Sequence, residues 1–478
     1  MAEKLVSRTE DFNEWYNTVV LRADMADYGP VRGTMIVKPY GWALWENIQK
    51  ALDTRFKATG VENAGFPMFI PMSFLQKEAQ HVEGFAPELA VVTHGGGQEL
   101  AEPIVVRPTS ETVIGHTYAK WVESYRDLPI LLNLWNSVVR WELRTKLFLR
   151  TLEFYWQEGH TAHATREEAE ERTRMMLDTY IDFAVNEAAV PVIPGIKSEK
   201  ERFAGAVETL TIEAMMGDGK ALQSGTSHHL GQNFAKAFDI QFLDQNNTLQ
   251  YAWTTSFGLS TRFIGAIIMT HGDDNGLILP PRLAPYQVVI VPIYKKDAEK
   301  TAVLEATARI RQELVQAGIR VKVDDRDNLT PGFKYNDWEL RGVPVRMEIG
   351  PRDLDKNSVA LARRDIPGRE GKQFVSQDGL AVTVQNLLDD IQANLLARAT
   401  KFRDDNTHDV TTYDELKEAV QTGFARAWWA GSNEDEQRVK EETKATIRCF
   451  PLEQPEGSGT CVLTGKPATR VAIFGRAY

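Results

Sequence analysis

The sequence predicts an α+β unit with an antiparallel sheet at residues 1–284, an α/β unit at 285–400 and a small α+β unit at 401–478. Two breaks lead to this division. The connector 279–285 is rich in proline, which stops helices and central strands. A charged stretch at 400–408 marks the second break. Between the two breaks, β-branched runs alternate with helical patterns, as in α/β domains. The length of 478 residues suits about three domains.

The composition is typical of a globular protein, with 43% hydrophobic and 25% charged residues. The first sixteen residues are polar and lack the apolar core of a signal peptide. The longest apolar candidate, 263–269, is too short to span a bilayer. We therefore expect a cytoplasmic protein without membrane contact. Two cysteines, Cys449 and Cys461, argue against a disulfide framework.

The net charge of −11 argues only weakly against a nucleic-acid partner, because local basic surface matters more than the total. Basic residues cluster between residues 140 and 150. A solvated face is the simpler explanation of this cluster.

In the first unit, apolar residues recur with helical spacing over 42–56. The segment 65–71 is extended and contains prolines, which favour an edge or interface position. The segments 131–142 and 152–157 are expected to be antiparallel strands around the basic loop.

In the second unit, strands are expected at 287–293, 319–323, 345–349 and 359–362, with helices at about 303–317 and 334–341. In the third unit, Thr411 and Thr412 precede a helix with acidic residues in its first turn. This helix is predicted to continue to Trp429. Strands follow at 445–450 and 470–474.

Two arginines carry the first chemical hypothesis. Arg140 lies in the hairpin, and Glu142 is expected on the same strand face. The pair is either a salt bridge or an arginine on a phosphate beside a carboxylate that holds magnesium. Arg262 precedes a buried helix and needs an acid or a ligand phosphate as partner. A guanidinium group can donate two parallel hydrogen bonds to phosphate oxygens, so the two arginines suggest a polyphosphate ligand. No phosphate loop or dinucleotide fingerprint is present.

Two polar segments have a structural and a functional interpretation. Residues 107–112 fit a helix cap, or a hydroxyl and a carboxylate that bind an ammonium group. Residues 223–234 contain His228 and His229. Adjacent histidines on a strand face opposite ways, which disfavours a shared metal and favours a polar ligand pocket.

Taken in order, these segments resemble the three signature motifs of class II aminoacyl-tRNA synthetases. Within the class the match is closest to prolyl-tRNA synthetases of the archaeal- and eukaryotic-like type. The helix with 65–71 resembles motif 1, 139–160 resembles motif 2, and 258–262 resembles motif 3. The most telling stretches are 107–111, 226–234, 342–350 and the C-terminal Tyr478.

The resemblance implies a class II catalytic domain, an anticodon-binding domain and a zinc-binding-like C-terminal domain. It also implies attachment of L-proline to tRNA(Pro), with ATP and Mg²⁺, through a prolyl-adenylate. A homodimer is implied, with Pro67 at its interface.

The resemblance also assigns residues to tasks. Arg140, Glu142 and Arg262 would be catalytic, with Arg140 on the α-phosphate and the proline carboxylate and Arg262 on the γ-phosphate. Proline would contact Thr109, Glu111, Arg140, Trp156 and His228. ATP would contact Arg140, Glu142, Arg150, Thr151, Phe154, Gln223, Thr226, Ser260 and Arg262. The anticodon would contact Phe333, Glu339, Arg346, Arg352 and Asp353.

Two departures from the family matter. The four zinc positions of the C-terminal domain fall at Ala430, Asp435, Cys461 and Thr464. A structural zinc needs four ligands, so no zinc is expected. The span 160–255 is too short for the large editing domain of the bacterial type, so no such domain is expected.

Two alternatives remain at this point. A catalytically silent relative would bind tRNA or a protein partner, but such relatives usually lose a motif arginine or the substrate pocket. A synthetase for threonine or histidine is disfavoured by 107–111 and by the missing zinc ligands or histidine-binding signature.

Overall fold

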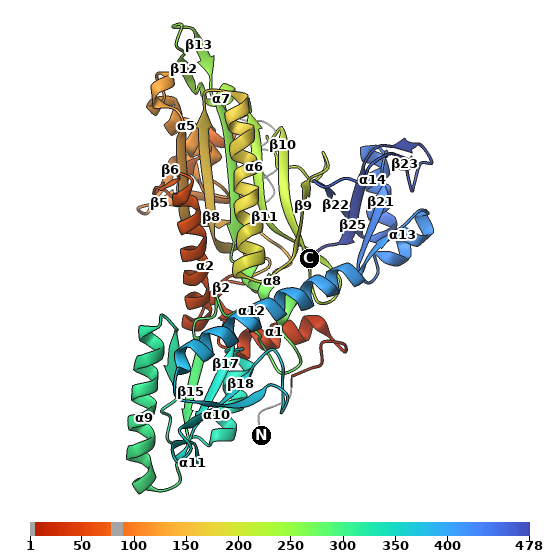
Figure 1. Ribbon diagram of the computed structural model, residues 1–478. Coiled ribbons are helices and arrows are strands. Elements are labelled where there is room, and N and C mark those ends of the chain that lie inside the picture. Colours follow the sequence, from red (N-terminus) through yellow and green to blue (C-terminus); the bar gives the residue numbers. More distant parts are fainter. Residues whose placement is uncertain (1–4, 78–88) are drawn as a thin grey trace.

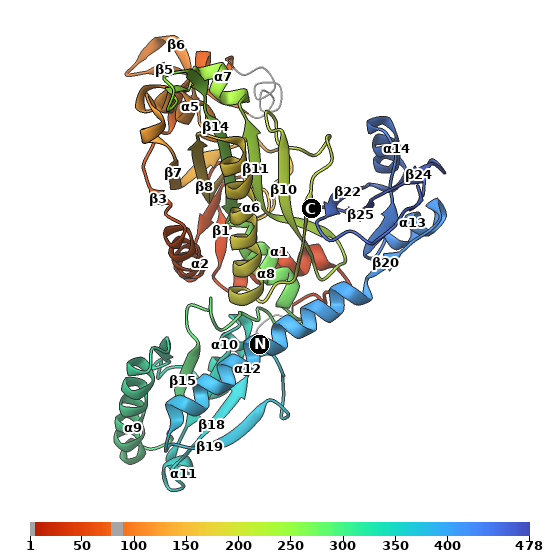
Figure 2. The ribbon, with the colours of Figure 1, turned by 45° about the horizontal axis from the view of Figure 1, so that its top comes forward.

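The computed structural model describes residues 5–77 and 89–478 (Figure 1). Residues 1–4 and 78–88, which belong to the predicted first unit, lie outside the described residues. The chain builds a tall body around one large sheet, a second body at its lower end and a third at its side. Helix α12 runs between the second and third bodies (Figure 2).

Among the described residues, an 11-stranded sheet lies at the centre of the fold. Its neighbouring strands are antiparallel except at the pairs β3–β7 and β20–β21. In spatial order the strands are β20 (Thr407–Asp409), β21 (Phe424–Trp428), β25 (Val471–Arg476), β22 (Ala445–Pro451), β9 (Val192–Ile196), β10 (Glu208–Met215), β11 (Ala221–Gly231), β14 (Trp253–Ser260), β8 (Glu153–His163), β7 (Ile130–Val139) and β3 (Glu62–Asn63).

The predicted hairpin is confirmed as β7 and β8, which pair from Ile130 opposite Ala162 to Val139 opposite Glu153. Strand β7 ends at Val139, so the expectation that Arg140 and Glu142 share a strand face is wrong. One further bond, from Arg140 N–H to the Leu152 carbonyl at 2.8 Å, continues the pairing. The chain then leaves the sheet, and this departure lets the following side chains turn toward the loop.

Helices cover one face of this sheet (Figure 1). Helix α6 (Arg166–Asp182) packs on β11, β14 and β10, and α2 (Pro39–Ala58) packs on α6. The predicted helix 42–56 is thus confirmed and begins three residues earlier, where Pro39 suits a first helical turn. Phe56, Tyr180 and Phe257 meet between the layers, with ring centroids 5.7–6.5 Å apart. This aromatic contact fixes the sheet that carries the site.

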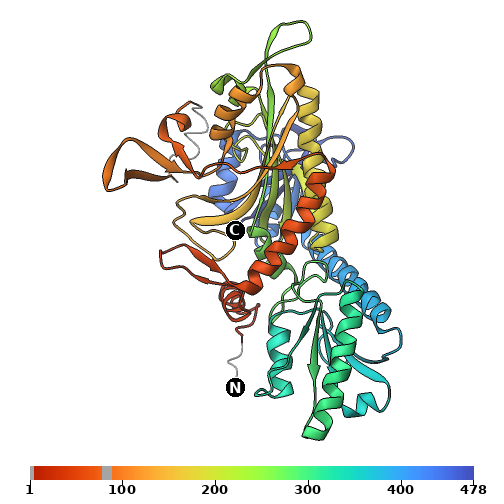
Figure 3. The ribbon, with the colours of Figure 1, turned by 90° about the vertical axis from the view of Figure 1, so that its left-hand side faces the viewer.

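The segment predicted as a strand at 65–71 is mostly irregular. Only Phe69–Pro71 forms a strand, β4, which pairs with β6 (Gln98–Val106); β6 also pairs with β5 (Ala90–Gly95). Pro67 has no N–H to donate to a ladder, which explains the short strand. The β5–β6 hairpin projects from the body (Figure 3). Met68 and Phe69 are exposed beside it.

The remaining elements of the first body connect these layers. They are α1 (Phe12–Arg22), β1 (Ala26–Tyr28), β2 (Met35–Val37), α3 (Met72–Leu75), α5 (Glu111–Trp121), α7 (Asn233–Phe238), β12 (Gln241–Leu243), β13 (Leu249–Tyr251) and α8 (Arg262–His271). Helix α8 is buried along almost all of its length, as predicted from its apolar run.

The second body is a five-stranded mixed sheet of order β16-β15-β17-β18-β19 with helices on it. Its strands are β15 (Val288–Pro292), β16 (Val321–Val323), β17 (Val345–Ile349), β18 (Ser358–Arg363) and β19 (Lys372–Ser376). Its helices are α9 (Asp297–Gln316), α10 (Pro331–Leu340), α11 (Pro351–Leu354) and α12 (Leu380–Asp405). The predicted β-α-β unit is confirmed, whereas β19 and α12 were not predicted.

Helix α12 runs through the predicted domain boundary at residue 400. Val384, Leu388, Ile391 and Leu395 recur at helical spacing and are buried in the second core. This apolar stripe stabilises the helix, and its charged end extends beyond the core. The charged stretch is therefore the end of a helix rather than an irregular linker.

In the third body, the prediction of one helix up to Trp429 is wrong. Helix α13 (Tyr413–Ala419) ends early, and the following chain forms β21. Gly423 lies between them, and a Cβ there would come within 2.1 Å of the Asn406 carbonyl oxygen. The body also contains α14 (Asn433–Thr443), which was not predicted, and the short strands β23 (Gly459–Thr460) and β24 (Pro467–Ala468). The two strands predicted near the C-terminus are confirmed as β22 and β25.

The third body joins the first through the sheet itself. Strand β22 pairs with β9, with Pro451 opposite Gly195. A Cβ on Gly195 would lie 2.6 Å from Cys449 Sγ, so glycine permits this close approach. We call this contact between β22 and β9 the joint. Beside it, the buried carboxylate of Glu213 accepts hydrogen bonds from Lys197 at 2.7 Å and from Arg448 at 2.9 Å and 3.0 Å. Main-chain pairing and a buried ion cluster therefore hold the third body in place.

Two sequence expectations concern the surface and the thiols. In the ranges 5–77 and 89–478, no helix is long and apolar enough to cross a membrane. Cys449 and Cys461 are buried and unbridged, as expected.

Candidate active site

Strands β7, β8, β14 and β11 and the start of α5 surround two adjoining cavities of about 240 Å³ and about 170 Å³. Both cavities are lined by Arg140, Phe154, Ser260 and Arg262, so they form two ends of one site. Every side chain predicted for proline or ATP lines one end or the other. The first end adds Thr109, Glu111, Trp156, Gln223, Thr226 and His228, and the second adds Glu142, Arg150 and Thr151.

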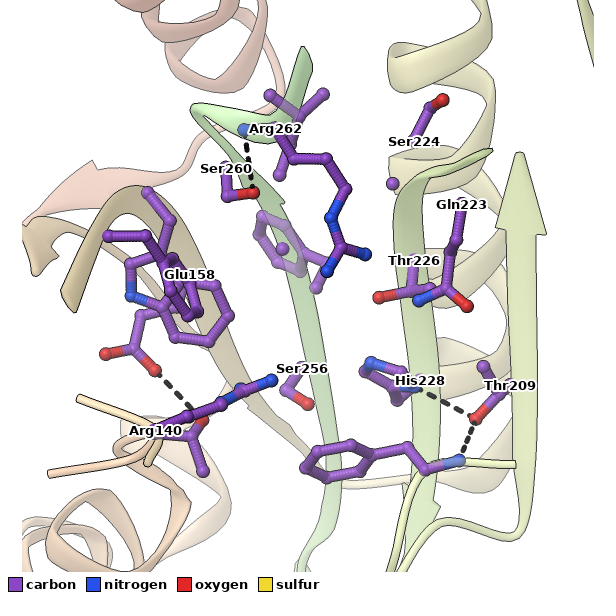
Figure 4. A pocket seen from close by; sticks show the side chains of 18 of the residues that line it. Arg140, Glu158, Thr209, Gln223, Ser224, Thr226, His228, Ser256, Ser260 and Arg262 are labelled. Atoms are coloured by element: carbon purple, nitrogen blue, oxygen red, sulfur yellow. Dashed lines mark hydrogen bonds between the residues drawn. The ribbon is translucent and has the colours of Figure 1, made fainter. Parts of the chain in front are cut away.

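Figure 4 shows how these side chains lie. Arg140 and Glu158 stand on one side of the pocket, and Gln223, Thr226 and His228 come from β11 on the other. Ser260 and Arg262 lie at one end between them. The site is therefore built from residues that are distant in sequence and adjacent only in the sheet.

The first end of the site begins where α5 begins. Glu111 is the first residue of the helix and also lines the cavity, while the Ser110 side chain at the N-cap makes no cap hydrogen bond, so the ammonium-binding interpretation of 107–112 stays a prediction. Thr109 Oγ1 lies 2.5 Å from Glu111 Oε2 and donates to it. Both side chains are buried. A hydroxyl and a carboxylate thus stand together at the closed end, where they suit a cationic amino group.

Glu158 and His160 belong to this end and were missed in the sequence. Both are 2% exposed, and His160 Nε2 lies 3.0 Å from Glu158 Oε2. Burial would raise the pKa of the Glu158 carboxyl, but the bond to His160, its charge and donors from Ser110 and Asn136 lower it. Burial would lower the pKa of His160, and Glu158 raises it. Glu158 and His160 lie at ordinary positions along strand β8. Apart from a charged residue in a buried strand, the local sequence contained nothing that predicted a site there.

His228 forms the opposite wall. Its Nδ1 lies 2.9 Å from Thr209 Oγ1, and its ring stacks on Phe203 at 4.5 Å. Burial lowers its pKa to about 3, helped by the charges of Arg140 and His160, so the ring is neutral near pH 7. His229 points away and stacks on Trp253. The two histidines therefore face opposite ways, as predicted.

Arg140 lies where the two ends meet. Its Nε donates to the Pro108 carbonyl oxygen at 3.0 Å. Its guanidinium carbon lies 5.4 Å from the ring centroids of Phe154 and of Trp156. Trp156 is itself fixed by a bond from its Nε1 to Asn136 at 2.7 Å. The arginine is held by its Nε and by two rings, which orients the guanidinium group.

Arg262 opens helix α8, as predicted. Its Nε donates to the Leu149 carbonyl oxygen at 3.1 Å, and its main-chain N–H donates to Ser260 Oγ at 3.2 Å. Burial, together with the charges of Arg150 and Arg140, lowers its pKa to about 10 against the opposing charge of Glu213. It stays protonated near pH 7. Arg140, Arg150 and Arg262 all line the second cavity, and three cations around one cavity favour an anionic ligand.

The second end is built on the loop between β7 and β8. Arg150 Nη1 donates to Glu142 at 3.1 Å, and Arg150 Nη2 donates to the main-chain oxygen of Tyr478 at 2.9 Å. The Tyr478 hydroxyl donates to Asp218 at 2.6 Å. Tyr478 of the third body therefore contacts the first body. Thr151 is buried, and its hydroxyl donates to the Glu153 carbonyl oxygen at 2.6 Å.

A separate cavity of about 340 Å³ lies in the second body. Of the predicted anticodon residues, it brings together Glu339 and Arg346. Phe333 and Arg352 are exposed outside it, and Asp353 accepts from the Gly350 N–H at 2.9 Å as a helix cap. Other aromatic and basic residues that line this cavity were not predicted from the sequence. They are Tyr335, Trp338, Arg363, Arg364, Arg369 and Lys372.

The four predicted zinc positions do not fit a zinc ion. Ala430 has no ligand atom, and Asp435 accepts from the Ser432 N–H at 2.9 Å as a cap of α14. Thr464 donates a hydrogen bond to the Cys461 thiol, which with main-chain N–H groups lowers the thiol pKa against the opposing effect of burial. Within the described residues no group of three or more metal-ligating side chains is found.

Three family models match the chain in the order of its bodies. Residues 92–271 match the tRNA synthetase class II core domain for G, H, P, S and T, and residues 287–394 match an anticodon binding domain. Residues 413–478 match the prolyl-tRNA synthetase C-terminal domain. A Roseiflexus sp. proline–tRNA ligase is 62% identical over 478 residues, covering 100% of this chain and 99% of the relative.

The chain belongs to the prolyl-tRNA synthetase family. The matched C-terminal domain is typical of the archaeal- and eukaryotic-like type, as the resemblance implied.

Other members of the family are similar over nearly all of this chain. The Bacteroides fragilis proline–tRNA ligase is 55% identical over 493 residues, covering 99% of each chain. A chloroplastic/mitochondrial proline–tRNA ligase from Arabidopsis thaliana is 59% identical, covering 98% of this chain and 88% of the relative. The similarity therefore extends over the regions of this chain that match the core, anticodon-binding and C-terminal models.

Proposed function

We propose that this class II proline–tRNA ligase forms a prolyl-adenylate from L-proline and ATP and then transfers the prolyl group to tRNA(Pro). One observation carries the proposal. The side chains assigned to proline line the first cavity, and those assigned to ATP line the second cavity or, for Gln223 and Thr226, the first. Arg140 lines both cavities.

In the first step an oxygen of the proline carboxylate attacks the α-phosphorus of ATP. The new O–P bond forms as the bond to the β-phosphate breaks, and pyrophosphate leaves. The carboxylate is already ionised, so no general base is needed. The site contributes by positioning and by neutralising charge. Arg140 is placed to hold the carboxylate and the α-phosphate at once.

The proline end binds the other half of the amino acid. Thr109 and Glu111 receive the imino group, and Trp156 and His228 enclose the ring. The neutral state of His228 supports this role, because a neutral ring does not repel the cation.

The ATP end orients the nucleotide. Arg262 binds the γ-phosphate, Phe154 stacks on adenine, and Arg150 and Glu142 hold the triphosphate side. The remaining contacts come from Thr151, Gln223, Thr226 and Ser260. Glu142 is a half-buried carboxylate in this end and suits one oxygen position of Mg²⁺. When bound, Mg²⁺ neutralises the charge of the leaving pyrophosphate.

The second step and the assembly extend the proposal beyond the cavity. The terminal ribose hydroxyl of tRNA attacks the prolyl carbonyl carbon, and AMP leaves. The basic and aromatic cavity of the second body suits single-stranded anticodon bases. The exposed Met68 and Phe69 beside Pro67 support a homodimer contact. We place the enzyme in the cytoplasm, although one named relative is an organelle form.

We further propose that the C-terminal domain holds no zinc. Sheet pairing to β9 and the Glu213 cluster replace the metal as its support. Metal analysis of the purified protein should find far less than one zinc per chain. One tightly held zinc per chain would contradict this.

The test of the function is ATP–pyrophosphate exchange with single amino acids. We expect exchange with L-proline and none with threonine or histidine. Exchange with another amino acid alone would replace the proline assignment. Absence of exchange with every amino acid, in a folded protein that binds tRNA, would instead support a silent relative.

A further inference from the structure

Glu158 lies in the wall of the proline end but has no assigned role. It is 2% exposed and lines the cavity beside Thr109 and Glu111. Its carboxylate accepts from the main-chain N–H of Ser110 at 3.0 Å and from its hydroxyl at 2.5 Å. Asn136 Nδ2 donates at 2.8 Å, and His160 lies at 3.0 Å. A buried carboxylate with this many partners is held rigidly.

The Thr109 hydroxyl lies between two carboxylates. Its oxygen is 2.5 Å from Glu111 Oε2 and 3.3 Å from Glu158 Oε2. A hydroxyl carries one hydrogen, so it donates fully to only one of them. While it donates to Glu111, it occupies the acceptor that an ammonium ligand would use. When it donates to Glu158, both Glu111 and the Thr109 oxygen are free to accept.

The number of acceptors matters for the ligand. A secondary ammonium such as that of proline has two N–H groups, whereas a primary ammonium has three. The Thr109 oxygen and Glu111 Oε2 are the two acceptor atoms that this hydrogen bond controls. A third N–H would face Glu158 Oε2, which accepts from the Ser110 N–H and would then also accept from Thr109, so that N–H would lose its water without a strong partner, which costs binding.

We propose that Glu158 is a positioning residue that takes the Thr109 hydroxyl hydrogen when substrate binds, so that the site presents two acceptors to a secondary ammonium. His160, Ser110 and Asn136 keep its carboxylate ionised and in place. The inference rests on the proposed function, since it assumes that Thr109 and Glu111 receive the imino group. It adds a reason for preferring proline over amino acids with a primary ammonium.

The first test is Glu158→Gln in ATP–pyrophosphate exchange. The amide of the introduced glutamine carries N–H donors. It would place them where the Ser110 N–H, the Ser110 hydroxyl, Asn136 and His160 already point at the Glu158 side chain. KM for proline should rise about tenfold or more, and the ratio of kcat/KM for proline to that for L-alanine should fall about tenfold. KM for ATP should change by less than about twofold, because Glu158 does not line the cavity that contains Glu142, Arg150 and Thr151. Glu170→Gln, an exposed change on α6, is the matched control and should alter none of these values.

The second test asks whether Glu158 acts through the hydroxyl of Thr109. Thr109→Val removes the hydroxyl and keeps the shape. In that background, Glu158→Gln should raise KM for proline by less than about twofold, because the hydrogen to be received is gone. Equal, additive effects would overturn the inference. So would a Glu158→Gln enzyme that loses kcat while its KM for proline and its selectivity stay unchanged.

The outcomes separate this inference from the proposed function. If the parent enzyme shows no exchange with proline, the proposed function fails. If exchange is normal but the double-mutant cycle is additive, only the inference fails. If thermal melting shows that the Glu158→Gln protein is unfolded, Ser110→Ala is used in its place. That variant removes one donor that holds Glu158, and it should raise KM for proline about threefold, again only when Thr109 is present.

Discussion

The two ends of the active site differ in how their charges are balanced. At the proline end, Glu111, Glu158 and His160 are buried and bonded to one another or to neighbouring hydroxyls. At the ATP end, cationic groups crowd one cavity, and those of Arg150 and Arg140 lower the pKa of Arg262. The first end is bonded internally, whereas the second end contains three arginines and the carboxylate of Glu142 and so carries an excess of positive charge.

The difference predicts distinct behaviour. A preorganised end selects by geometry, because its groups have little freedom to adapt. A cationic end gains most from neutralisation, because its like charges repel until phosphate binds.

Arg140 serves both ends, so its loss should be the most damaging. Arg140→Ala should lower proline-dependent exchange by roughly 10³-fold, because it removes a charge from the reacting phosphate. Arg144→Ala, an exposed change in the same loop, is the control and should keep activity. Melting temperatures of both proteins show whether the fold is intact. An Arg140→Ala enzyme that retains most of its activity would remove this residue from the site.

The joint between the first and third bodies should support the ATP end alone. Glu213→Gln leaves Lys197 and Arg448 buried without their carboxylate, and it should cost about 3–5 kcal/mol of stability. The charge of Glu213 also raises the pKa of Arg262, and the third body brings Tyr478 to Arg150. KM for ATP should therefore rise about tenfold, estimated from the loss of one charged contact. KM for proline should stay nearly constant.

The matched control for this change is Glu170→Gln, which breaks an exposed ion pair with Arg166. Chemical denaturation should show no measurable loss of stability for it. A Glu213→Gln protein that is as stable as this control would contradict the role of the joint. So would equal effects on the KM values of both substrates.

Ionic strength should separate the ends without a mutation. Raising salt from about 0.05 M to 0.5 M screens partly exposed cations more than buried ones. KM for ATP should rise a few-fold, and KM for proline by less than about twofold. Kinetics with each substrate varied in turn measure both values. A larger effect on proline would reverse the contrast.

Acid should act on the proline end through His228. Its pKa is about 3 in the folded protein and near 6.5 when unfolded. Below pH 6.5 the unfolded chain therefore binds more protons, so stability falls as pH falls. The loss is about 1.4 kcal/mol for each pH unit between 6.5 and 4. His163 and His271, whose pKa values burial also lowers, contribute to the same range. His228→Asn should therefore reduce the slope of that part of the profile in denaturation experiments, and an unchanged slope would contradict it.

The sequence predicted the site better than the folding of the regions around it. Arg140, Arg262 and the 107–112 turn carry local signals, because each combines a special residue with a recognisable element end. Their meeting in one cavity followed from the order of the motifs. Glu158 carried no such signal, because its importance arises from donors on β7, the α5 turn and its own strand.

The larger errors share one cause. Helix α13 was predicted to reach Trp429, but residues 424–428 pair with β20 and β25. The contact between β22 and β9 joins residues about 255 positions apart. Pairing over such separations is set by tertiary contacts, which local periodicity does not report. The long α12 was missed because its charged end dominated the composition near residue 400.

If the two ends bind separate substrates, two single variants in the two ends should have opposite effects on the KM values. Glu111→Gln and Arg262→Gln are compared in ATP–pyrophosphate exchange, with KM measured for proline and for ATP. Glu111→Gln should raise KM for proline at least tenfold and leave KM for ATP within about twofold, and Arg262→Gln should do the reverse. If each variant weakened both substrates equally, the division into a proline end and an ATP end would be wrong.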